Sequence, residues 1–165
     1  MARLRQWQSI VNKVLECIRN NDMVLRLISN DSEKAYEIPA PPWNKILMKN
    51  VFPMPKEPLS VSTQKQFINV YMARTIPSFE NPYYHEDYLY VEVGCHIETW
   101  MMANGEIRPY TICALLDEMF DNFSIPDMSI QKVLPSDYSV LKFGDMFYGY
   151  RMIYKMTNIG SMNCE

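Results

Sequence analysis

Glycine is scarce in this sequence, with five residues in a chain of 165, and the five are well separated. Loops that cradle phosphate groups need clustered glycines, so that backbone N–H groups can approach the anion. The sequence therefore excludes the common glycine-rich nucleotide-binding loops.

Cysteine is also uncommon, and no two of the four cysteines have the CxxC spacing of metal and redox motifs. Cys17, Cys95 and Cys113 fall on the apolar faces of expected elements, whereas Cys164 lies near the end of the chain. We interpret the first three as buried free thiols in a reducing compartment. None of the four has an evident activating base, so we expect no cysteine nucleophile.

Only two histidines, His85 and His96, are available for acid–base chemistry near neutral pH. Glu98 follows His96 at strand spacing, which suits a proton shuttle or a metal ligand. Because the pattern offers no second ligand, a histidine at a surface or interface is the favoured interpretation. The adjacent carboxylates Glu86 and Asp87 point apart in a strand. We therefore predict no catalytic residue, no metal site and no cofactor, and a protein that is not an enzyme.

Long apolar runs and an excess of positive charge are absent. No stretch approaches the roughly 18 consecutive apolar residues of a membrane helix, and MARLRQWQSI lacks the uninterrupted apolar segment of a signal peptide. We expect no membrane contact and a protein made in a cytoplasm. The net charge of −3 and the pI near 5.4 exclude a basic DNA-binding footprint at the level of the whole chain.

The chain is rich in apolar residues, with 48% hydrophobic and 13% aromatic, which is enough for one packed domain over residues 1–165. Within it we predict an N-terminal helix over 3–20, a proline-rich extended loop over 29–65 and an α+β core over 66–157. The helix has one apolar stripe at three- and four-residue spacing. The stripe consists of Leu4, Trp7, Val11, Val14, Leu15 and Ile18.

A short apolar segment, MVLRLI, follows the first helix. Asp22 precedes this segment and is expected to cap a short helix there. A strand is the alternative, because so short an apolar run cannot be assigned by its period.

Six of the eleven prolines lie between Pro39 and Pro58. Proline removes a backbone donor and favours extended geometry in the residue before it, so no regular helix or central strand is expected there. The same segment carries Trp43, Phe52 and Met54, so it is not a simple polar linker. Either it folds over its own domain or it packs against a partner.

The core shows the period-two alternation of β-strands. We predict a strand over 65–74 and, after a turn-rich connection over 76–87, a longer strand from Asp87 to about Trp100. The longer strand has an apolar face and a more polar face. The apolar face holds Leu89, Val91, Val93, Cys95 and Ile97, and the other holds Tyr88, Tyr90, Glu92, His96 and Glu98.

A turn then leads to a helix that begins near Pro109 and ends near Asn122, with its acidic residues expected to face solvent. A short strand is expected over 128–134, and residues 139–157 form one long strand or a hairpin bent at Gly144. This order of elements predicts an α+β domain, a mostly antiparallel β-sheet with the N-terminal helix and a second helix packed on one face.

Several aromatic and methionine side chains are predicted to lie at contacts between subunits, because these residue types are enriched in the cores of interfaces. They come from the proline-rich loop, from the more polar face of the long strand and from one face of the C-terminal strand. The predicted interface residues are Trp43, Phe52, Met54, Tyr88, Tyr90, His96, Tyr148 and Tyr150.

The chain resembles the tail-terminator and head–tail joining proteins of tailed bacteriophages, in the style of the lambda-type tail terminator. The resemblance spans roughly residues 45–157 and lies in the element order, with NKILMKNVFPMPKEP, LYVEVGCHIET, LLDEMFDNF and FYGYRMIYKMTN in succession. It implies a small α+β subunit that assembles as a ring, commonly a hexamer. Such rings stop tail-tube polymerisation and dock to the head connector, and the resemblance carries no catalytic residues over to this chain.

The resemblance also implies a place in the neck or tail of the virion. The tail tube protein and the head–tail connector would be the partners, and DNA would pass through the lumen without specific binding. A head-completion or stopper protein under the portal is the alternative within the same class. From the residues alone, two other classes stay open: a small cytoplasmic ligand-binding or enzymatic α+β domain with a pocket near His96 and Glu98, and a nucleic-acid-binding module.

Overall fold

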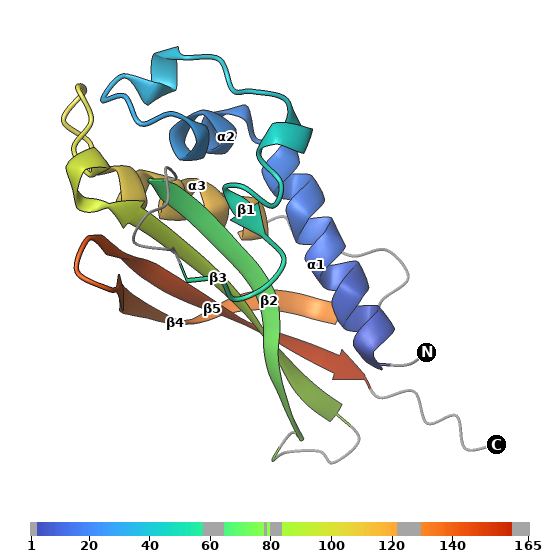
Figure 1. Cartoon of the computed structure of the whole chain (residues 1–165). Coiled ribbons are helices and arrows are strands. Elements are labelled where there is room, and N and C mark those ends of the chain that lie inside the picture. Colours follow the sequence, from blue (N-terminus) through green and yellow to red (C-terminus); the bar gives the residue numbers. More distant parts are fainter. Residues whose placement is uncertain (1–2, 58–64, 78, 80–83, 122–129, 160–165) are drawn as a thin grey trace.

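The computed structural model describes residues 3–57, 65–77, 79, 84–121 and 130–159. Five strands form one sheet in the order β1-β2-β3-β5-β4, and the described α-helices pack on one of its faces (Figure 1). Among the described strands only the β1–β2 pair is parallel, so the predicted α+β class with a mostly antiparallel sheet is confirmed. The elements are α1 (Arg3–Arg19), α2 (Asp22–Ser29), η1 (Ala35–Glu37), η2 (Trp43–Lys45), β1 (Val51–Phe52), β2 (Gln66–Pro77), β3 (Tyr84–His96), η3 (Ile97–Thr99), α3 (Arg108–Asp121), β4 (Ile130–Phe143) and β5 (Phe147–Ile159).

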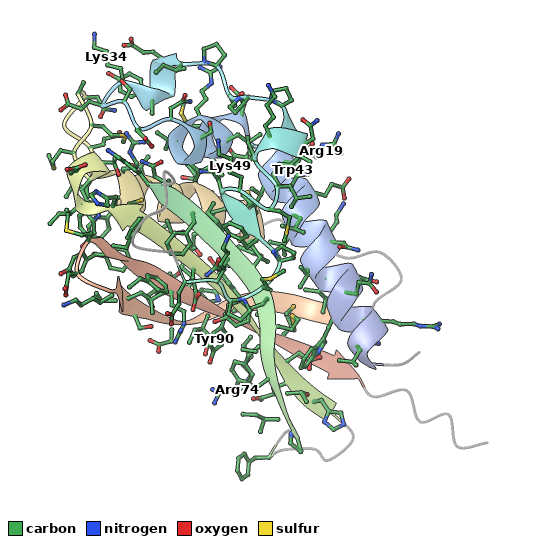
Figure 2. The ribbon with its side chains drawn as sticks, viewed as in Figure 1. Arg19, Lys34, Trp43, Lys49, Arg74 and Tyr90 are labelled. Carbon is green, nitrogen blue, oxygen red and sulfur yellow. The ribbon has the colours of Figure 1, made fainter. Side chains whose placement is uncertain are left out.

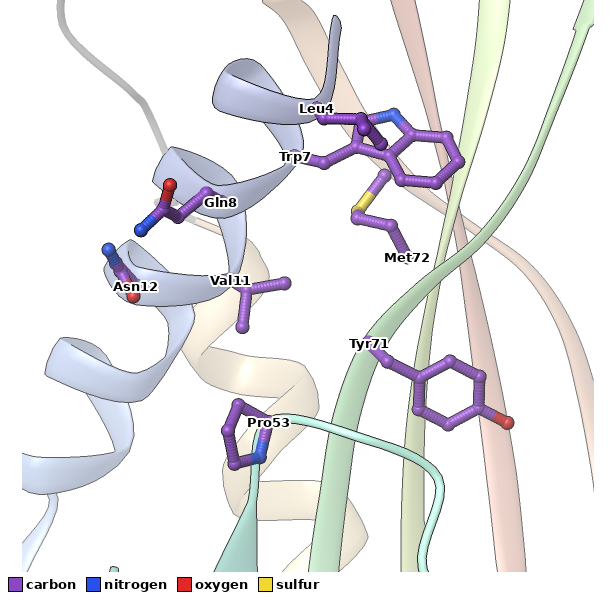
Figure 3. Close-up of a pocket in the computed structure, with 8 residues that line it drawn as sticks. All are labelled: Leu4, Trp7, Gln8, Val11, Asn12, Pro53, Tyr71 and Met72. Atoms are coloured by element: carbon purple, nitrogen blue, oxygen red, sulfur yellow. The ribbon is translucent and has the colours of Figure 1, made fainter.

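The predicted N-terminal helix is α1, and its central contacts with the core come from Ile10, Val14 and Ile18, which are fully buried. The prediction that Leu4 belongs to the buried stripe is wrong, because Leu4 is 73% exposed. It lies in the first turn of α1, on the side turned toward an open groove (Figure 3). Ile10, which the predicted stripe omitted, takes the buried position instead.

The segment after α1 is the helix α2 and not a strand, but Asp22 is not its cap. The side chain of Asn21 accepts a hydrogen bond from the backbone N–H of Val24 at 3.1 Å, which satisfies a donor of the first turn. Asp22 is already helical and pairs with Arg26 one turn later, at 2.6 Å. The cap therefore lies one residue before the predicted position.

The C-terminal end of α2 is held by a buried cation. Arg108 is fully buried and donates from Nη1 to the carbonyl oxygens of Leu27, at 2.9 Å, and Asn30. Its Nη2 donates to the carbonyl of Ser32 at 2.5 Å. These carbonyls lie at and beyond the end of α2, where a helix has unpaired acceptors and a partial negative charge. Burial lowers the pKa of Arg108, and α3 begins at this residue, with Pro109 in its first turn as predicted.

The proline-rich loop is anchored to its own domain within the described residues. Ala35, Ile46 and Val51 are part of the main hydrophobic core. The side-chain amide of Asn50 donates to the backbone carbonyl of Ile28 at 2.7 Å and to that of Gln66, in β2, at 3.0 Å. The only strand in this segment, among the residues that the structure describes, is the two-residue edge strand β1, so no central strand runs through it.

The boundaries of the two middle strands differ from the prediction. β2 continues to Pro77 and β3 already begins at Tyr84, so both strands extend into the predicted connection. β3 ends at His96, because the His96 side chain accepts a hydrogen bond from the backbone N–H of Glu98 at 3.3 Å and caps the turn η3. The alternation therefore stops before Ile97, which is exposed and not on the buried face.

The C-terminal region is a hairpin, as one of the two alternatives predicted. β4 and β5 are antiparallel, and the turn between them includes Gly144 in the left-handed region at φ +63. The predicted short strand and the first arm of the hairpin are one strand, β4, that passes through Pro135. Proline is tolerated there because β4 is an edge strand and its register shifts between Pro135 and Asp137.

None of the helices in the described ranges is long and apolar enough to cross a membrane.

Candidate assembly surfaces

The face of the sheet opposite the α-helices, here called the helix-free face, has a buried carboxylate near its centre. Glu92 is only 2% exposed. Its Oε1 accepts hydrogen bonds from Nε and Nη2 of Arg151, at 2.9 and 2.7 Å, and from the hydroxyl of Tyr71 at 2.8 Å. Its Oε2 accepts a hydrogen bond from the amide of Asn69 at 3.0 Å. The cation and these donors offset the cost of removing the carboxylate from water.

Aromatic rings and arginines surround this network. The rings of Tyr71 and Tyr90 lie 5.7 Å apart, and the guanidinium of Arg151 lies 5.1 Å from the Tyr90 ring. Arg74 makes the equivalent contact with Tyr88 at 4.5 Å. Burial and the neighbouring Glu92 raise the pKa of Tyr71, so its hydroxyl remains a donor over the whole ordinary pH range. On the helix-free face, the tyrosine and arginine side chains therefore shield one another from solvent.

At one end of the helix-free face two glycines lie opposite each other, Gly94 on β3 and Gly149 on β5. A Cβ at position 94 would lie 2.3 Å from the ring of Phe67, so the ring occupies the space that the missing side chain leaves. Phe52 and Phe147 complete a small second core there, apart from the main one.

Five of the predicted interface residues lie on β3 and β5, but not on the same face. Tyr88, Tyr90 and His96 are half-buried on the helix-free face. Tyr148 and Tyr150 are half-buried on the helix side of β5, because they alternate with residues of the helix-free face. The structure therefore brings them together as two groups.

The other three predicted interface residues belong to the proline-rich loop. Trp43 is partly buried against the main core, Met54 is exposed, and Phe52 is 1% exposed inside the second core. Trp43 lies beside α1, whereas Tyr90 lies on the other side of β2 (Figure 2). A role of these eight residues in subunit contacts stays a prediction.

An exposed apolar surface lies at the β4 edge, on the helix side of the sheet; we call it the β4 patch. Val140 and Tyr138 are 71% and 52% exposed, and they stand opposite Tyr150 and Met152 of β5. α3 packs on β3 and β5 and reaches β4 at Tyr138, but it leaves Val140 and about half of the Tyr138 side chain exposed. It consists of Tyr110, Tyr138, Val140, Tyr148 and Tyr150.

The β4 patch is partly ordered by contacts with α3. The rings of Tyr110 and Tyr150 lie 4.8 Å apart, and burial raises the pKa of Tyr150 to about 12. Asp117 of α3 accepts a hydrogen bond from the hydroxyl of Tyr138 at 3.1 Å and another from Tyr154 at 2.9 Å. Asp117 is therefore half-buried and engaged, and the prediction that all the acidic residues of this helix face solvent is wrong for it.

A groove lies at the opposite edge of the sheet, between α1 and β2 (Figure 3); we call it the α1–β2 groove. Its volume is about 440 Å³. The indole N–H of Trp7 donates to the carboxylate of Asp87 at 3.1 Å, which fixes one wall. The groove is lined by Leu4, Trp7, Gln8, Val11, Asn12, Pro53, Tyr71 and Met72.

The titratable residues considered in the sequence are occupied structurally. His96 packs edge-on against Phe147, with ring centroids 5.2 Å apart, and lies 3.6 Å from the Glu98 carboxylate. Glu98 also pairs with Lys65 at 3.0 Å, which lowers the pKa of that carboxyl. Within the described ranges no three or more His, Cys, Asp or Glu side chains are grouped so that they could hold a metal.

The described cysteines are free thiols. Cys95 is fully buried, whereas Cys17 and Cys113 are only partly buried, so the prediction of burial is too strong for these two. Burial raises the pKa of Cys113 to about 12 and also raises the pKa values of Cys95 and Cys17. These cysteines are therefore protonated and poor nucleophiles at neutral pH. Cys164 lies outside the described residues.

Comparison with protein families gives a match to YomW over residues 21–156. The chain belongs to the YomW family. The family name YomW derives from a Bacillus SPBeta-like phage, and it associates this chain with a bacteriophage. A comparison with curated proteins finds no match.

The YomW match includes α2, α3 and all the strands as far as position 156 of β5, so both the network at Glu92 and the β4 patch lie inside it. α1, which forms one wall of the α1–β2 groove, lies outside the YomW match.

The sequence pattern identified part of these surfaces. Tyr88, Tyr90, Tyr148 and Tyr150 were found from the alternation of two strands. Val140 was missed, although it shares one face of β4 with the exposed residues Tyr138 and Lys142 and could have been found by the same period.

Proposed function

We propose that this protein is a structural subunit of a phage neck, a tail terminator that forms a ring on the end of the tail tube and joins it to the head connector. The observation that carries the proposal is the combination of a phage-derived family with a sheet whose two edges differ. A cyclic ring requires two different surfaces on each subunit that fit one another. The exposed β4 patch and the concave α1–β2 groove are two such surfaces.

In this function the protein acts by assembly and not by chemistry. Glu92, the most buried carboxylate of the helix-free face, is fully engaged with Arg151, Tyr71 and Asn69. It therefore has a structural role in holding three strands together. The net charge of −3 suits a ring through which DNA slides without being retained, because an acidic wall repels the phosphates.

The test uses the purified chain and tail tubes from the same phage, imaged by negative-stain electron microscopy. We expect a ring of density at one end of each tube, and tubes of one length when the protein is present during tube assembly. Tubes that grow to variable lengths and carry no added density would contradict the proposal. Density on isolated portals instead would identify a head-completion protein under the portal.

A further inference from the structure

We propose that β4 of one copy of this chain adds to the free edge of β2 in a second copy, with Tyr138 and Val140 seated in the α1–β2 groove of that second copy. The inference describes how subunits of the proposed ring contact each other. It rests on the proposed function, because the ring makes another copy of the same chain the partner of each edge. Five observations in the structure support it.

The first observation is that β2 has a free edge where the groove lies. β1 pairs with β2 only at Ile68 and Asn69. From Val70 to Pro77, none of the strands in the described ranges pairs with the outer side of β2. An unpaired strand edge offers a row of backbone donors and acceptors to an incoming strand.

The second observation is that β4 is the complementary free edge. Among the described strands it pairs with β5 alone, on its inner side, over a register that extends from Ile130 to Phe143. From β2 to β4 the sheet passes through three antiparallel pairs, β2–β3, β3–β5 and β5–β4. Because the strand direction reverses at each pair, β4 runs opposite to β2 within one subunit. A rotation about an axis along the strands therefore brings β4 of one copy antiparallel to β2 of the next. The sheet then continues from one subunit into another.

The third observation is that the side chains meet on the correct face. Tyr138 and Val140 point to the helix side of β4, since they stand opposite residues of β5 that face the helices. α1 lies on the same side, beside β2 (Figure 1). In a continued sheet these two side chains would therefore face Leu4 and Val11 of the neighbouring copy, which line the groove.

The fourth observation is that each surface lacks the cover that the other supplies. α3 lies over β3 and β5 and contacts β4 at Tyr138 through Asp117, but it leaves Val140 71% exposed. The groove beside β2 is an open concavity with an apolar rim at Leu4, which is 73% exposed. α1 of the next copy would cover the β4 patch, and β4 would fill the groove, so both apolar surfaces are removed from water at once.

The fifth observation is charge complementarity. In the continued sheet, α3 of one copy and α1 of the next would stand side by side above β4. Among its described side chains α1 has three basic residues, Arg5, Lys13 and Arg19, and one acidic residue, Glu16, which pairs with Lys13. On α3, Glu118 is exposed and acidic, Asp117 is half-buried and bonded to Tyr138 and Tyr154, and the only basic residue of the helix, Arg108, is fully buried. Opposite charges on the two helices favour this partner and orientation.

The experiment uses two variants that each block one surface. Val140→Lys blocks the β4 patch and places a cation toward the basic α1. Leu4→Glu blocks the groove and places an anion toward the acidic α3. Both side chains are more than two thirds exposed, so we expect circular dichroism and melting temperature to match the wild type. Ile38→Lys, at an exposed apolar residue between η1 and η2 that lines neither the groove nor the β4 patch, is the control.

Multi-angle light scattering and sedimentation velocity give the mass of each species, with and without tail tubes. We expect the wild type and Ile38→Lys to form closed rings, and Val140→Lys and Leu4→Glu to remain at the 19.5 kDa mass of one chain. An equimolar mixture of the two blocked variants should give dimers that contain one copy of each. The intact groove of Val140→Lys accepts the intact β4 of Leu4→Glu. The β4 edge of Val140→Lys and the groove of Leu4→Glu are both blocked, so no third copy can add.

Three results would overturn the inference: a wild type that stays monomeric with and without tubes, rings that persist in either blocked variant, or dimers formed by one blocked variant alone. The last result would show a two-fold contact between identical surfaces. The outcomes are separable from those of the proposed function. Rings that form as expected but do not bind tubes reject the tail terminator, whereas capped tubes with Val140→Lys reject only the edge contact.

Discussion

The two faces of the sheet are buried in different ways. On the helix side, aliphatic residues such as Leu89, Val91 and Val93 are fully buried beneath the helices. On the helix-free face, polar residues are equally buried although none of the described helices lies above them. Asn69 is fully buried and Glu92 is 2% exposed. Their partners are side chains from adjacent strands and, for Asn69, also the backbone carbonyl of Lys56 in the proline-rich loop.

The difference shows that burial on the helix-free face depends on specific pairing, whereas burial on the helix side depends on apolar area. Removal of one methylene group from an aliphatic core costs about 1 kcal/mol and leaves the rest of the core in place. Removal of one partner from a buried carboxylate leaves a charge without compensation. The helix-free face should therefore be the more sensitive of the two to single polar substitutions.

The largest expected effect comes from Gly149, where β3 and β5 are in close contact. A Cβ at position 149 would lie 1.8 Å from the backbone carbonyl oxygen of Val93. Because backbone atoms of a paired strand cannot move aside, Gly149→Ala should lower the free energy of unfolding by more than about 3 kcal/mol. Urea denaturation followed by circular dichroism measures it.

Gly94→Ala is the comparison for that substitution, because the nearest atoms to its added Cβ belong to the ring of Phe67 and not to the backbone. The ring can turn, so we expect a smaller loss of about 1–3 kcal/mol. Equal losses for the two variants would show that the tight approach of β3 and β5 is not a rigid feature.

The second prediction concerns the charge at the centre of the helix-free face. Arg151→Met retains much of the side-chain volume but leaves Glu92 buried without its cation. We expect a loss of about 3 kcal/mol in the free energy of unfolding at neutral pH. Lys155→Met is the control, since the Lys155–Glu86 pair is more exposed and should contribute less than about 1 kcal/mol. If the two variants lose the same stability, the distinction between the two pairs is wrong.

The difference between the faces also explains what the sequence could predict. The period-two alternation of β3 assigned Leu89 and Val93 to the apolar face and Tyr90 and Glu92 to the other, as found. The alternation did not show that Glu92 is buried, because its partners come from β2 and β5. Arg151 is 59 positions away in the chain.

Arg108 illustrates the same limit on the helix side. Its acceptors lie 76 to 81 positions away, at the end of α2, and no local pattern distinguishes it from an exposed arginine at the start of a helix. Of the surfaces proposed for assembly, one could be predicted in part from a local pattern and the other could not. Tyr150 was found from its own strand, whereas the α1–β2 groove depends on how α1 packs beside β2 and has no signature in either segment.

The third prediction tests a polar contact on the helix side. Tyr154 is fully buried, its ring stacks on Phe120 with centroids 4.1 Å apart, and its hydroxyl donates to Asp117. Tyr154→Phe keeps the ring and removes only the hydroxyl, with its hydrogen bond to Asp117 and its weaker contact with the sulfur of Met152, so we expect a loss of about 1–2 kcal/mol. The matched substitution Tyr138→Phe removes an exposed hydroxyl from the same carboxylate and should change the free energy of unfolding by less than about 0.5 kcal/mol. A larger effect at Tyr138 than at Tyr154 would contradict the assignment.

The smallest expected effect is pH-dependent and belongs to the rim of the helix-free face. Glu86 accepts a hydrogen bond from Lys155 at 2.5 Å, and this contact lowers the pKa of the carboxyl below its ordinary value of 4.5. A carboxyl with a depressed pKa in the folded state stabilises the fold above the pKa of the unfolded chain, and the contribution is lost as the pH falls through the folded value. Glu86→Gln should therefore be less stable than the wild type at pH 7, by under about 1 kcal/mol. The difference should narrow as the pH falls below 4.5. Urea denaturation of both proteins across this range measures it, and a difference that stays constant with pH would show that Glu86 acts by packing and not by charge.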